Sequence, residues 1–221
     1  MKPFSSRFEA GRLLATKLSR YRNHPEVLIL ALPRGGVPVA YEIAKELNIL
    51  IDVFLVRKLG VPGNRELAMG AIASGGLGML NEDVVRAFEV SEAEIQSATD
   101  TERMELEKRE RLYRGTRPPL NLLNRTVILV DDGLATGATM LVAVQAVRQQ
   151  YPARIVVAVP VAATETCEKI KTEVDEIVCE TTVDTLYAIG AWYENFTQLS
   201  DEEVSELLNR ASLIKESTEK L

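Results

Sequence analysis

The stretch Val127-Ile-Leu-Val-Asp-Asp-Gly-Leu-Ala-Thr-Gly-Ala-Thr139 decides both the fold class and the first functional hypothesis. It contains most of an apolar run over 126–130, the kind of continuous run that parallel sheets bury. Two adjacent carboxylates follow, and a turn of small residues leads into a helix predicted near 138–150. Backbone N–H groups at the start of a helix, helped by the helix dipole, favour a phosphate dianion. The stretch therefore predicts a strand–turn–helix unit with a phosphate site.

The acidic pair, Asp131 and Asp132, limits which ligand the phosphate can belong to. Carboxylates repel a phosphate unless they face a hydroxyl-bearing or metal-bridged part of the same ligand. Glycines in the turn let the backbone approach closely, and its threonines add hydroxyl donors. The pattern thus predicts a phosphorylated sugar whose hydroxyls meet the two carboxylates. Asp-Asp-Gly alone is more typical of a surface turn, but the strand before it and Thr-Gly-Ala-Thr after it favour the binding site.

Further apolar runs and helix caps on both sides of this unit extend the same alternation. Strands are predicted over 27–32, 51–56, 126–130, 155–159 and 174–178, and helices over about 6–21, 38–47, 91–114 and 138–150, with a short helix capped by Thr164 and a last one capped by Ser200. Strands that alternate with helices at this spacing indicate βαβ units. The predicted fold is therefore α/β and doubly wound, with a mainly five-stranded parallel sheet flanked by helices.

The chain is predicted to form one domain over 1–221, with the sheet core at about 26–180. An insertion of a long loop plus a helix occupies about 57–125, and the two chain ends, about 1–25 and 180–221, form a small hood. The segment 57–80 holds six glycines and one proline with little periodicity. A loop of that length is normally functional or disordered, so the loop is expected to matter for activity.

Composition excludes several classes of function. The 26 basic and 32 acidic residues give a net charge of −6, which argues against bulk electrostatic binding of nucleic acid or an anionic membrane. Two cysteines and one histidine argue against a zinc or iron–sulfur site, a disulfide framework and a Ser-His-Asp hydrolase. No signal peptide or membrane span is recognisable, so a reduced cytoplasmic protein is expected. Its two cysteines, Cys167 and Cys179, are then interpreted as small buried hydrophobic residues.

A second candidate loop, Pro33-Arg34-Gly35-Gly36, follows the first predicted strand. Ligands of open α/β sheets bind at the carboxyl ends of the strands, so this loop should lie on the same edge as Asp131. The glycines expose backbone amides, and the arginine offers a planar donor fork for phosphate oxygens. The alternative is a plain strand-to-helix turn with a solvated arginine.

Two further groups of residues carry weaker signals. Arg57 and Lys58 end the second predicted strand, where they either bind an anion or form a solvated strand end. Trp192 and Phe196 belong to an aromatic cluster after the last predicted strand. Such aromatics can stack on a planar heterocycle, but they can equally pack the last helix against the body.

The segment 127–139 closely resembles the phosphoribosyl-pyrophosphate signature of the type I phosphoribosyltransferases. The resemblance implies that Asp131 and Asp132 hold the ribose hydroxyls, with Mg²⁺ bound indirectly through ribose or water. The residues that follow would bind the substrate and its 5′-phosphate: Gly133, Leu134, Ala135, Thr136, Gly137, Ala138 and Thr139. An aspartate found in this loop of the hypoxanthine-guanine enzymes is replaced here by Ala135, so a 6-oxopurine acceptor is disfavoured.

The other loops resemble family features in the same chain order. The segment 32–36 is similar to the pyrophosphate loop, in which a cis peptide would join Pro33 to Arg34. Arg57 and Lys58 resemble the start of a flexible catalytic loop in adenine and orotate enzymes. The aromatic segment around Trp192 weakly resembles a hood that stacks on the base. The closest overall resemblance is to a group of bacterial phosphoribosyltransferase-like proteins.

The resemblance implies a glycosyltransferase of nucleotide metabolism that moves the phosphoribosyl group to a nitrogen acceptor, such as a nucleobase, and releases pyrophosphate with Mg²⁺. Its partners would be these small molecules, with no nucleic acid or membrane, and a homo-oligomer is allowed. One alternative is a regulator of nucleotide metabolism that senses phosphoribosyl pyrophosphate without turnover. Another is a hydrolase that uses water as the acceptor. The residue that activates the acceptor is not identified by the sequence.

Overall fold

A five-stranded sheet forms the centre of the computed structural model, which describes residues 3–218, apart from the side chains of 65, 66 and 213–218. The strand order is β2-β1-β6-β7-β8, and every neighbouring pair is parallel. The strands are β1 (Val27–Ala31), β2 (Leu50–Val53), β6 (Thr126–Val130), β7 (Arg154–Ala163) and β8 (Glu176–Val183). The predicted five-stranded parallel sheet is confirmed, and its order reverses direction between β1 and β6, where ligands of such folds bind.

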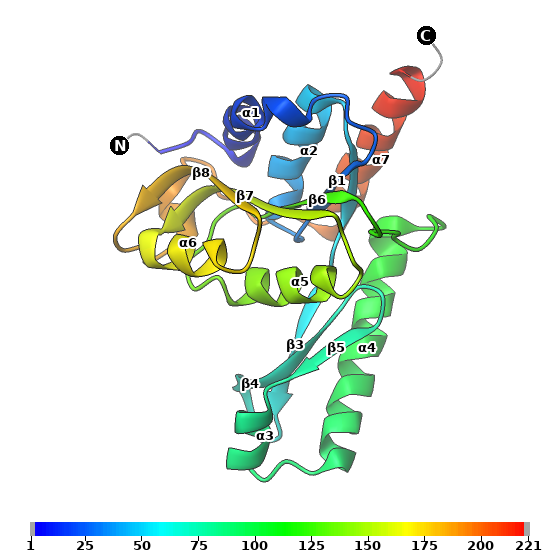
Figure 1. Cartoon of the computed structure of the whole chain (residues 1–221), viewed down its shortest axis with the longest axis vertical. Coiled ribbons are helices and arrows are strands. Elements are labelled where there is room, and N and C mark those ends of the chain that lie inside the picture. The colour runs from blue at the N-terminus through cyan, green and yellow to red at the C-terminus, as the bar shows by residue number, and fades with distance from the viewer. Residues whose placement is uncertain (1–2, 219–221) are drawn as a thin grey trace.

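Helices cover both faces of this sheet (Figure 1). One face carries α1 (Arg7–Lys17), α2 (Gly36–Leu47) and α7 (Asp201–Thr218), and the other carries α5 (Ala138–Arg148) and α6 (Thr164–Lys171). Alternate residues of β1 serve the two faces: Ile29 packs in the cluster that contains α2, and Leu30 packs in the cluster that contains α5. Because both faces are covered, the strands are apolar without alternation, which is why they were recognisable from sequence.

Several boundaries differ from the predicted ones. The second strand ends at Val53 rather than at 56, and β8 begins at Glu176 rather than at 174. The strand β7 runs to Ala163 and includes Pro160, so it is longer than the predicted 155–159. The first helix ends at Lys17 and is followed by a short 3-10 helix, η1 (Ser19–Tyr21). These differences leave the order of the elements unchanged.

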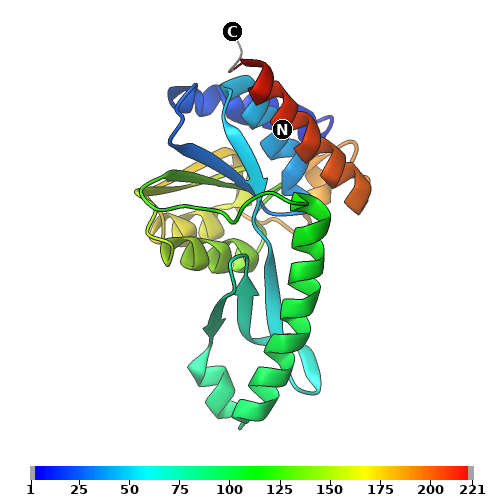
Figure 2. The same ribbon diagram turned by 90° about the vertical axis from the view of Figure 1, so that its right-hand side faces the viewer.

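The segment 57–80 is not a long loop, and that part of the prediction was wrong. It forms a separate antiparallel sheet of β3 (Val56–Val61), β4 (Asn64–Ala73) and β5 (Leu77–Leu80), in that order. Together with α3 (Glu82–Ala87) and the long α4 (Glu92–Arg114), this sheet makes an arm that projects from the core (Figures 1 and 2). The arm continues the apolar core, since Leu59, Met69 and Leu106 are buried and belong to the same cluster as residues of β1 and α2.

The glycines that suggested a loop lie where the arm needs tight turns or close backbone contact. Pro62-Gly63 is a two-residue connection between β3 and β4, and Gly63 has a φ of +78°, as the third position of a type II turn requires. Gly75 and Gly76 have φ values of +85° and +76° between β4 and β5. At Gly70 a side-chain Cβ would lie 2.3 Å from the Met79 carbonyl oxygen. These glycines therefore form the turns between strands, or allow two strands to approach closely, and do not prevent strand formation.

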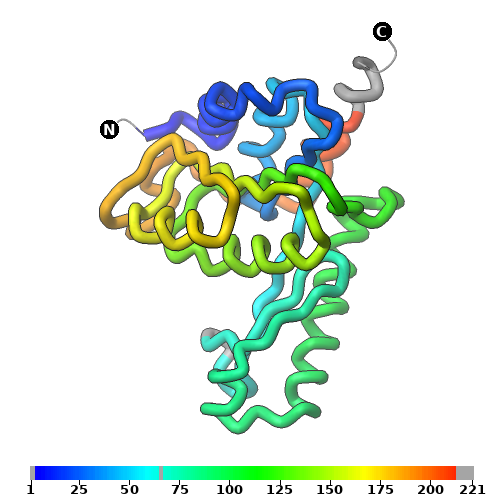
Figure 3. Tube along the Cα trace, viewed as in Figure 1, coloured from blue at the N-terminus to red at the C-terminus, as the bar shows by residue number. Residues whose placement is uncertain are grey.

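The segment around Phe4 packs against the segment 189–194 and Val161 of β7. In Figure 3 the described start of the chain lies next to the strand β8, far from the end of α7. Phe4 forms an isolated parallel bridge with Tyr193, just after the 3-10 helix η2 (Ile189–Trp192). The Phe4 N–H donates to the Trp192 carbonyl at 2.9 Å, and the Glu194 N–H donates to the Phe4 carbonyl at 2.8 Å. This pairing fixes the start of α1 beside the functional loops. In the described part of the chain no helix is both long enough and apolar enough to cross a membrane.

Candidate functional site

The acidic pair lies where β6 ends, at the carboxyl edge of the sheet. Asp131 is half-buried and Asp132 is 7 % exposed. The Asp132 N–H donates to Asp131 Oδ1 at 2.8 Å, which fixes the first carboxylate against the backbone of the second. The other oxygen of Asp131, Oδ2, takes part in no hydrogen bond with the residues that the structure describes. Asp131 is therefore the member of the pair that is free to contact a ligand.

Asp132 is held by a cation that the sequence interpretation missed. Arg7, in the first turn of α1, is 9 % exposed, and its Nε donates to Asp132 Oδ2 at 2.8 Å. Its Nη1 donates to the Thr197 carbonyl at 3.1 Å, and its guanidinium carbon lies 3.8 Å from the centre of the Phe196 ring. The Tyr193 hydroxyl donates to the Asp132 carbonyl at 2.7 Å. Residues from the first and the last part of the chain, Arg7 and Tyr193, thus hold Asp132 in place.

The environment of the pair opposes ionisation of both carboxyl groups. Burial, followed by the negative charge of Asp132, raises the pKa of Asp131 well above its ordinary value. Burial also raises the pKa of Asp132, and the hydrogen bond and charge of Arg7 oppose that rise. Binding of a cation or of hydroxyl donors to this pair is therefore favourable, because it stabilises the ionised form of the carboxyl groups.

The loop after β1 lies directly against the acidic pair. The Leu32 N–H donates to the Val130 carbonyl at 2.8 Å, and a Cβ on Gly35 would lie 2.0 Å from Asp132 Oδ2. A Cβ on Gly36 would lie 2.5 Å from the Val130 carbonyl oxygen. Only glycine therefore permits this close approach. The predicted cis peptide between Pro33 and Arg34 is present.

The Arg34 side chain lies on the side of this loop that faces α7. Its Nη1 is 4.0 Å from Asp201 Oδ1, and its side chain is 37 % exposed. The Tyr113 hydroxyl, at the end of α4, donates to the same Asp201 oxygen. Burial, together with the Asp201 carboxylate, raises the pKa of Tyr113. Arg34 is thus held loosely and retains donors for an anion.

The loop 133–139 is anchored at its start and open at its end. The Leu134 N–H donates to the Val161 carbonyl at 2.8 Å, and the Ala163 N–H donates to the Leu134 carbonyl at 3.0 Å. Thr166 Oγ1 donates to the Ala135 carbonyl at 2.6 Å. Gly133 packs on Ile189, and Gly137 has a φ of +69°. The other loop residues, Thr136, Ala138 and Thr139, are exposed at the start of α5. Exposed amides at a helix start suit a phosphate group.

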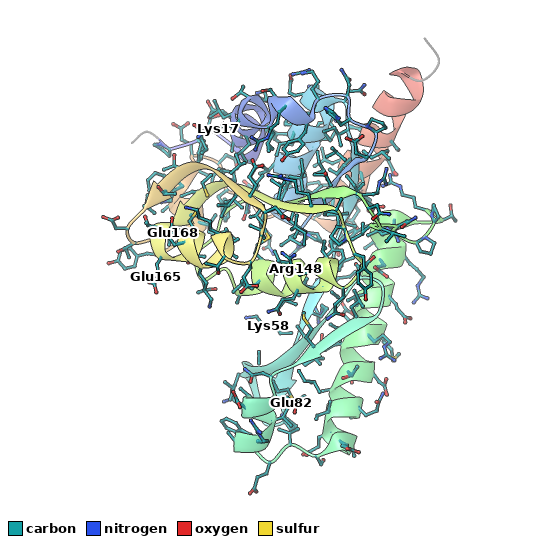
Figure 4. The ribbon with its side chains drawn as sticks, in the orientation of Figure 1. Lys17, Lys58, Glu82, Arg148, Glu165 and Glu168 are labelled. Carbon is teal, nitrogen blue, oxygen red and sulfur yellow. The ribbon has the colours of Figure 1, made fainter. Side chains whose placement is uncertain are left out.

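Arg57 and Lys58 do not lie at the end of a core strand, as the sequence interpretation had placed them. Both belong to β3 of the arm, and Lys58 is labelled below α5 in Figure 4. Arg57 Nη2 forms an ion pair with Glu102 of α4 at 2.6 Å. Among the described side chains, neither residue forms a hydrogen bond or ion pair with residues 33–36 or 131–139. Their predicted role in binding pyrophosphate stays a prediction.

The predicted aromatic residues lie close to Phe4 and to Arg7, which binds Asp132. Trp192 packs against a cluster that includes Phe4 and Val161. Phe196 is 37 % exposed and lies between the Arg7 guanidinium and Tyr193, whose ring centre is 5.3 Å away. In this arrangement both residues support the site, and stacking on a base stays a prediction.

The donor set at this edge fits a magnesium ion that is carried largely by a ligand. Among the side chains that the structure describes, no group of three or more His, Cys, Asp or Glu could hold a metal ion. The free oxygen of Asp131 is available, whereas Asp132 Oδ2 is bound by Arg7. Mg²⁺ prefers oxygen ligands, keeps several waters and is commonly held by one or two carboxylates plus phosphate oxygens. The residues present therefore fit indirect binding of Mg²⁺.

Fold and loops together define an α/β protein with a glycine loop and an acidic pair at the carboxyl ends of β1 and β6. The family model described as phosphoribosyl transferase domain matches residues 6–191. The chain belongs to this family, as the sequence resemblance indicated.

Individual relatives agree with this assignment. A protein of Mycobacterium tuberculosis H37Rv named "Putative phosphoribosyl transferase Rv0571c" is 43 % identical over 211 residues, which is 96 % of this chain and 47 % of that protein. The chain thus spans about half the length of the curated relatives it matches. The crystal structure of TT1426 from Thermus thermophilus has a TM-score of 0.82 at 41 % identity and covers 95 % of this chain and 99 % of that chain. The structure of AQ2163 from Aquifex aeolicus is 13 % identical with a TM-score of 0.51, and the match covers 91 % of this chain and 84 % of the AQ2163 chain. At this identity the match shows a shared fold and nothing more.

Proposed function

We propose that the protein transfers the 5-phosphoribosyl group from phosphoribosyl pyrophosphate to a nitrogen acceptor, with release of pyrophosphate. The observation that carries the proposal is the convergence of three ligand-binding elements at one sheet edge. These are the acidic pair after β6, the glycine loop after β1 and the backbone amides at the start of α5, of which that of Ala138 makes a long hydrogen bond of 3.5 Å to Thr136 Oγ1. Their spacing along one edge suits a sugar that carries a phosphate at one end and a pyrophosphate at the other.

Each element has a distinct task in this reaction. The amides of 136–139 bind the 5′-phosphate, and the free oxygen of Asp131 accepts hydrogen bonds from the ribose hydroxyls. The amides of Gly35 and Gly36, with the Arg34 guanidinium, bind the pyrophosphate. The acceptor nitrogen attacks the anomeric carbon, its bond to that carbon forms, and the carbon–oxygen bond to pyrophosphate breaks with the electron pair leaving on oxygen. Catalysis comes from positioning and from neutralising the leaving group.

The carboxylate of Asp131 also faces the positive charge that develops on the sugar ring. Asp132 acts differently, because Arg7 holds it and it keeps the loop around Asp131 in place. Mg²⁺ would be held by Asp131 through water or ribose, and when bound it supplies neutralisation of the pyrophosphate oxygens.

The proposal is tested by incubating the full chain with Mg²⁺ and phosphoribosyl pyrophosphate, across a panel of nucleobases and related heterocycles. Released pyrophosphate is measured, and the same panel is run as a thermal-shift experiment, since a bound acceptor stabilises by linkage. We expect release that depends on one acceptor. Release without any added acceptor would indicate a hydrolase, and stabilisation by phosphoribosyl pyrophosphate without release would indicate a sensor. Absence of both binding and release would contradict the proposed site.

Arg34→Ala is expected to weaken the binding of pyrophosphate by about 10- to 150-fold, and that of ribose 5-phosphate less than twofold. The reason is that a charge-assisted hydrogen bond contributes about 1.5–3 kcal/mol, and this one is assigned to pyrophosphate alone. Titration calorimetry with each ligand measures the two changes in affinity. Arg12→Ala is the matched control, because Arg12 is an exposed arginine of α1 whose nearest ion pair, with Glu42, spans 3.7 Å. Equal losses for both ligands would remove Arg34 from the pyrophosphate site.

A further inference from the structure

The two cysteines of the chain lie in contact next to Thr166, which supports the loop 133–139, called the phosphate loop below for its proposed role. Cys167 Sγ of α6 and Cys179 Sγ of β8 are 3.0 Å apart, although the residues are separated by 12 positions. Both thiols are free. Cys167 is 7 % exposed and Cys179 is half-buried on β8, which is the edge strand of the sheet. The sequence interpretation as small buried hydrophobic residues is confirmed for Cys167, which is buried in an apolar cluster, and holds only in part for Cys179, which is half-buried against that cluster.

We infer that Cys167 and Cys179 form a site of reversible oxidation, at which a peroxide converts the two thiols into an intramolecular disulfide. The contact already brings the two sulfurs within about 1 Å of the separation that a disulfide bond needs. No movement of a whole element is therefore required. The chain has only these two cysteines, so no other intramolecular pair competes.

The surroundings of the two thiols shift their pKa values in opposite directions. The hydrogen bond with Cys179 lowers the pKa of the Cys167 thiol, against opposing effects of burial and of the Glu168 carboxylate. The same contact, with burial, raises the pKa of Cys179. Figure 4 places Lys17 on α1 and Glu168 on α6 around this end of the sheet, and Lys17 Nζ donates to the Cys179 carbonyl at 3.0 Å. Cys167 is thus the sulfur that reacts first.

The reaction balances with hydrogen peroxide as the oxidant. The Cys167 sulfur attacks a peroxide oxygen, the O–O bond breaks, and a sulfenic acid and one water form. The Cys179 sulfur then attacks the Cys167 sulfur, the S–S bond forms, and the hydroxyl leaves with the thiol proton as a second water. Both thiols are oxidised, and one peroxide is reduced to two waters. A dithiol reductant returns the pair to thiols by exchange.

The position of the pair links it to the site described above. Thr166, the residue before Cys167, donates to the Ala135 carbonyl at 2.6 Å. A Cβ on Gly137 would lie 2.6 Å from Thr166 Cγ2, so the phosphate loop rests on this residue. A disulfide would fasten α6 to β8 and hold Thr166 under the loop. This consequence, unlike the disulfide itself, rests on the proposed function of the loop.

The test uses the reduced full chain, treated with hydrogen peroxide and examined by intact mass and peptide mapping without any ligand. We expect a loss of about 2 Da, a peptide pair joined through Cys167 and Cys179, and reversal by dithiothreitol. The closed loop is short, so the thermal midpoint of the oxidised chain should rise by about 5–10 °C. Unchanged mass, a gain of about 32 Da from sulfinic acid, or dimers on a non-reducing gel would each overturn the inference.

Cys179→Ser supplies the matched control, because it keeps Cys167 and removes its partner. Peroxide should then give the sulfinic acid at Cys167 and no rise in thermal midpoint. Amide exchange at 135–139 separates the local consequence from the disulfide: severalfold slower exchange after oxidation supports the coupling to the loop, and unchanged exchange overturns it. None of these readouts uses phosphoribosyl pyrophosphate, so a failed transferase assay leaves the result on the disulfide standing.

Discussion

Asp131→Asn is expected to lower kcat/KM for phosphoribosyl pyrophosphate by about 100-fold while leaving the fold intact. The substitution removes the charge that accepts hydrogen bonds from the ribose hydroxyls and faces the developing positive charge, and an interaction of that kind contributes about 2–4 kcal/mol in the transition state. Asparagine keeps a carbonyl oxygen, so the Asp132 N–H retains an acceptor at the position now 2.8 Å away. Initial rates of pyrophosphate release over a range of substrate concentrations measure the loss.

The same variant is expected to be more stable than the parent chain at neutral pH. Burial and the charge of Asp132 raise the pKa of Asp131 above its unfolded value, so ionising this carboxyl costs stability as pH rises through the shifted pKa. Thermal midpoints should therefore be similar near pH 4 and diverge in favour of the variant toward pH 8. Asp100→Asn, at an exposed position of α4, is the control and should change neither quantity. Full activity in Asp131→Asn, or a variant less stable at pH 8, would contradict the assigned role.

Arg7→Met is expected to destabilise the protein more than any other single substitution at the site. It leaves the Asp132 carboxylate buried without its cation, and breaking a buried pair in this way costs about 3–5 kcal/mol. For a chain of this size that cost corresponds to a fall in thermal midpoint of about 6–20 °C. Without Arg7 the pKa of Asp132 rises further, so the loss should be largest at neutral pH and shrink as pH falls and the carboxyl is protonated.

A double-mutant cycle distinguishes the pair from general damage to α1. Adding Asp132→Asn to Arg7→Met removes the stranded charge and should recover at least half of the lost stability. Arg103→Met is the control, because the side chains of Arg103 and of its ion-pair partner Asp100 are 47 % and 54 % exposed, and its effect should stay within about 0.5 kcal/mol. Equal losses in the two single variants, or no recovery in the double variant, would show that Arg7 does not act through Asp132.

The sheet and the order of its loops could be predicted because each has a local signature, and the cis peptide after Pro33 was implied by the family resemblance. Strands covered on both faces are apolar throughout, and the loops that follow them keep the spacing of their chemistry along the chain. The segment 57–80 could not be recognised from glycine content alone. Pro62-Gly63, preceded by Leu59 and Val61, is a usable hairpin signal that a prediction from glycine content does not include.

Arg7 and Tyr193 were missed for a different reason. Their contact with Asp132 joins the first and last parts of the chain, and no local pattern encodes a pairing between residues 125 and 61 positions apart. One signal was available, since Arg7 shares a helix face with the buried Ala10 and Leu14. A charged residue on an apolar helix face needs a partner of opposite charge. The acidic pair Asp131 and Asp132, which follows a buried strand, was a candidate for that partner.

Titration of the full chain with phosphoribosyl pyrophosphate and Mg²⁺ by calorimetry, in parallel with Asp131→Asn, tests the central claim most directly. The account predicts saturable binding to the parent chain with one site per chain, and affinity at least tenfold weaker in the variant at pH 7.5. Binding that is absent from the parent chain, or equal in the two proteins, would contradict the assignment of the β6 acidic pair to the ribose of this substrate.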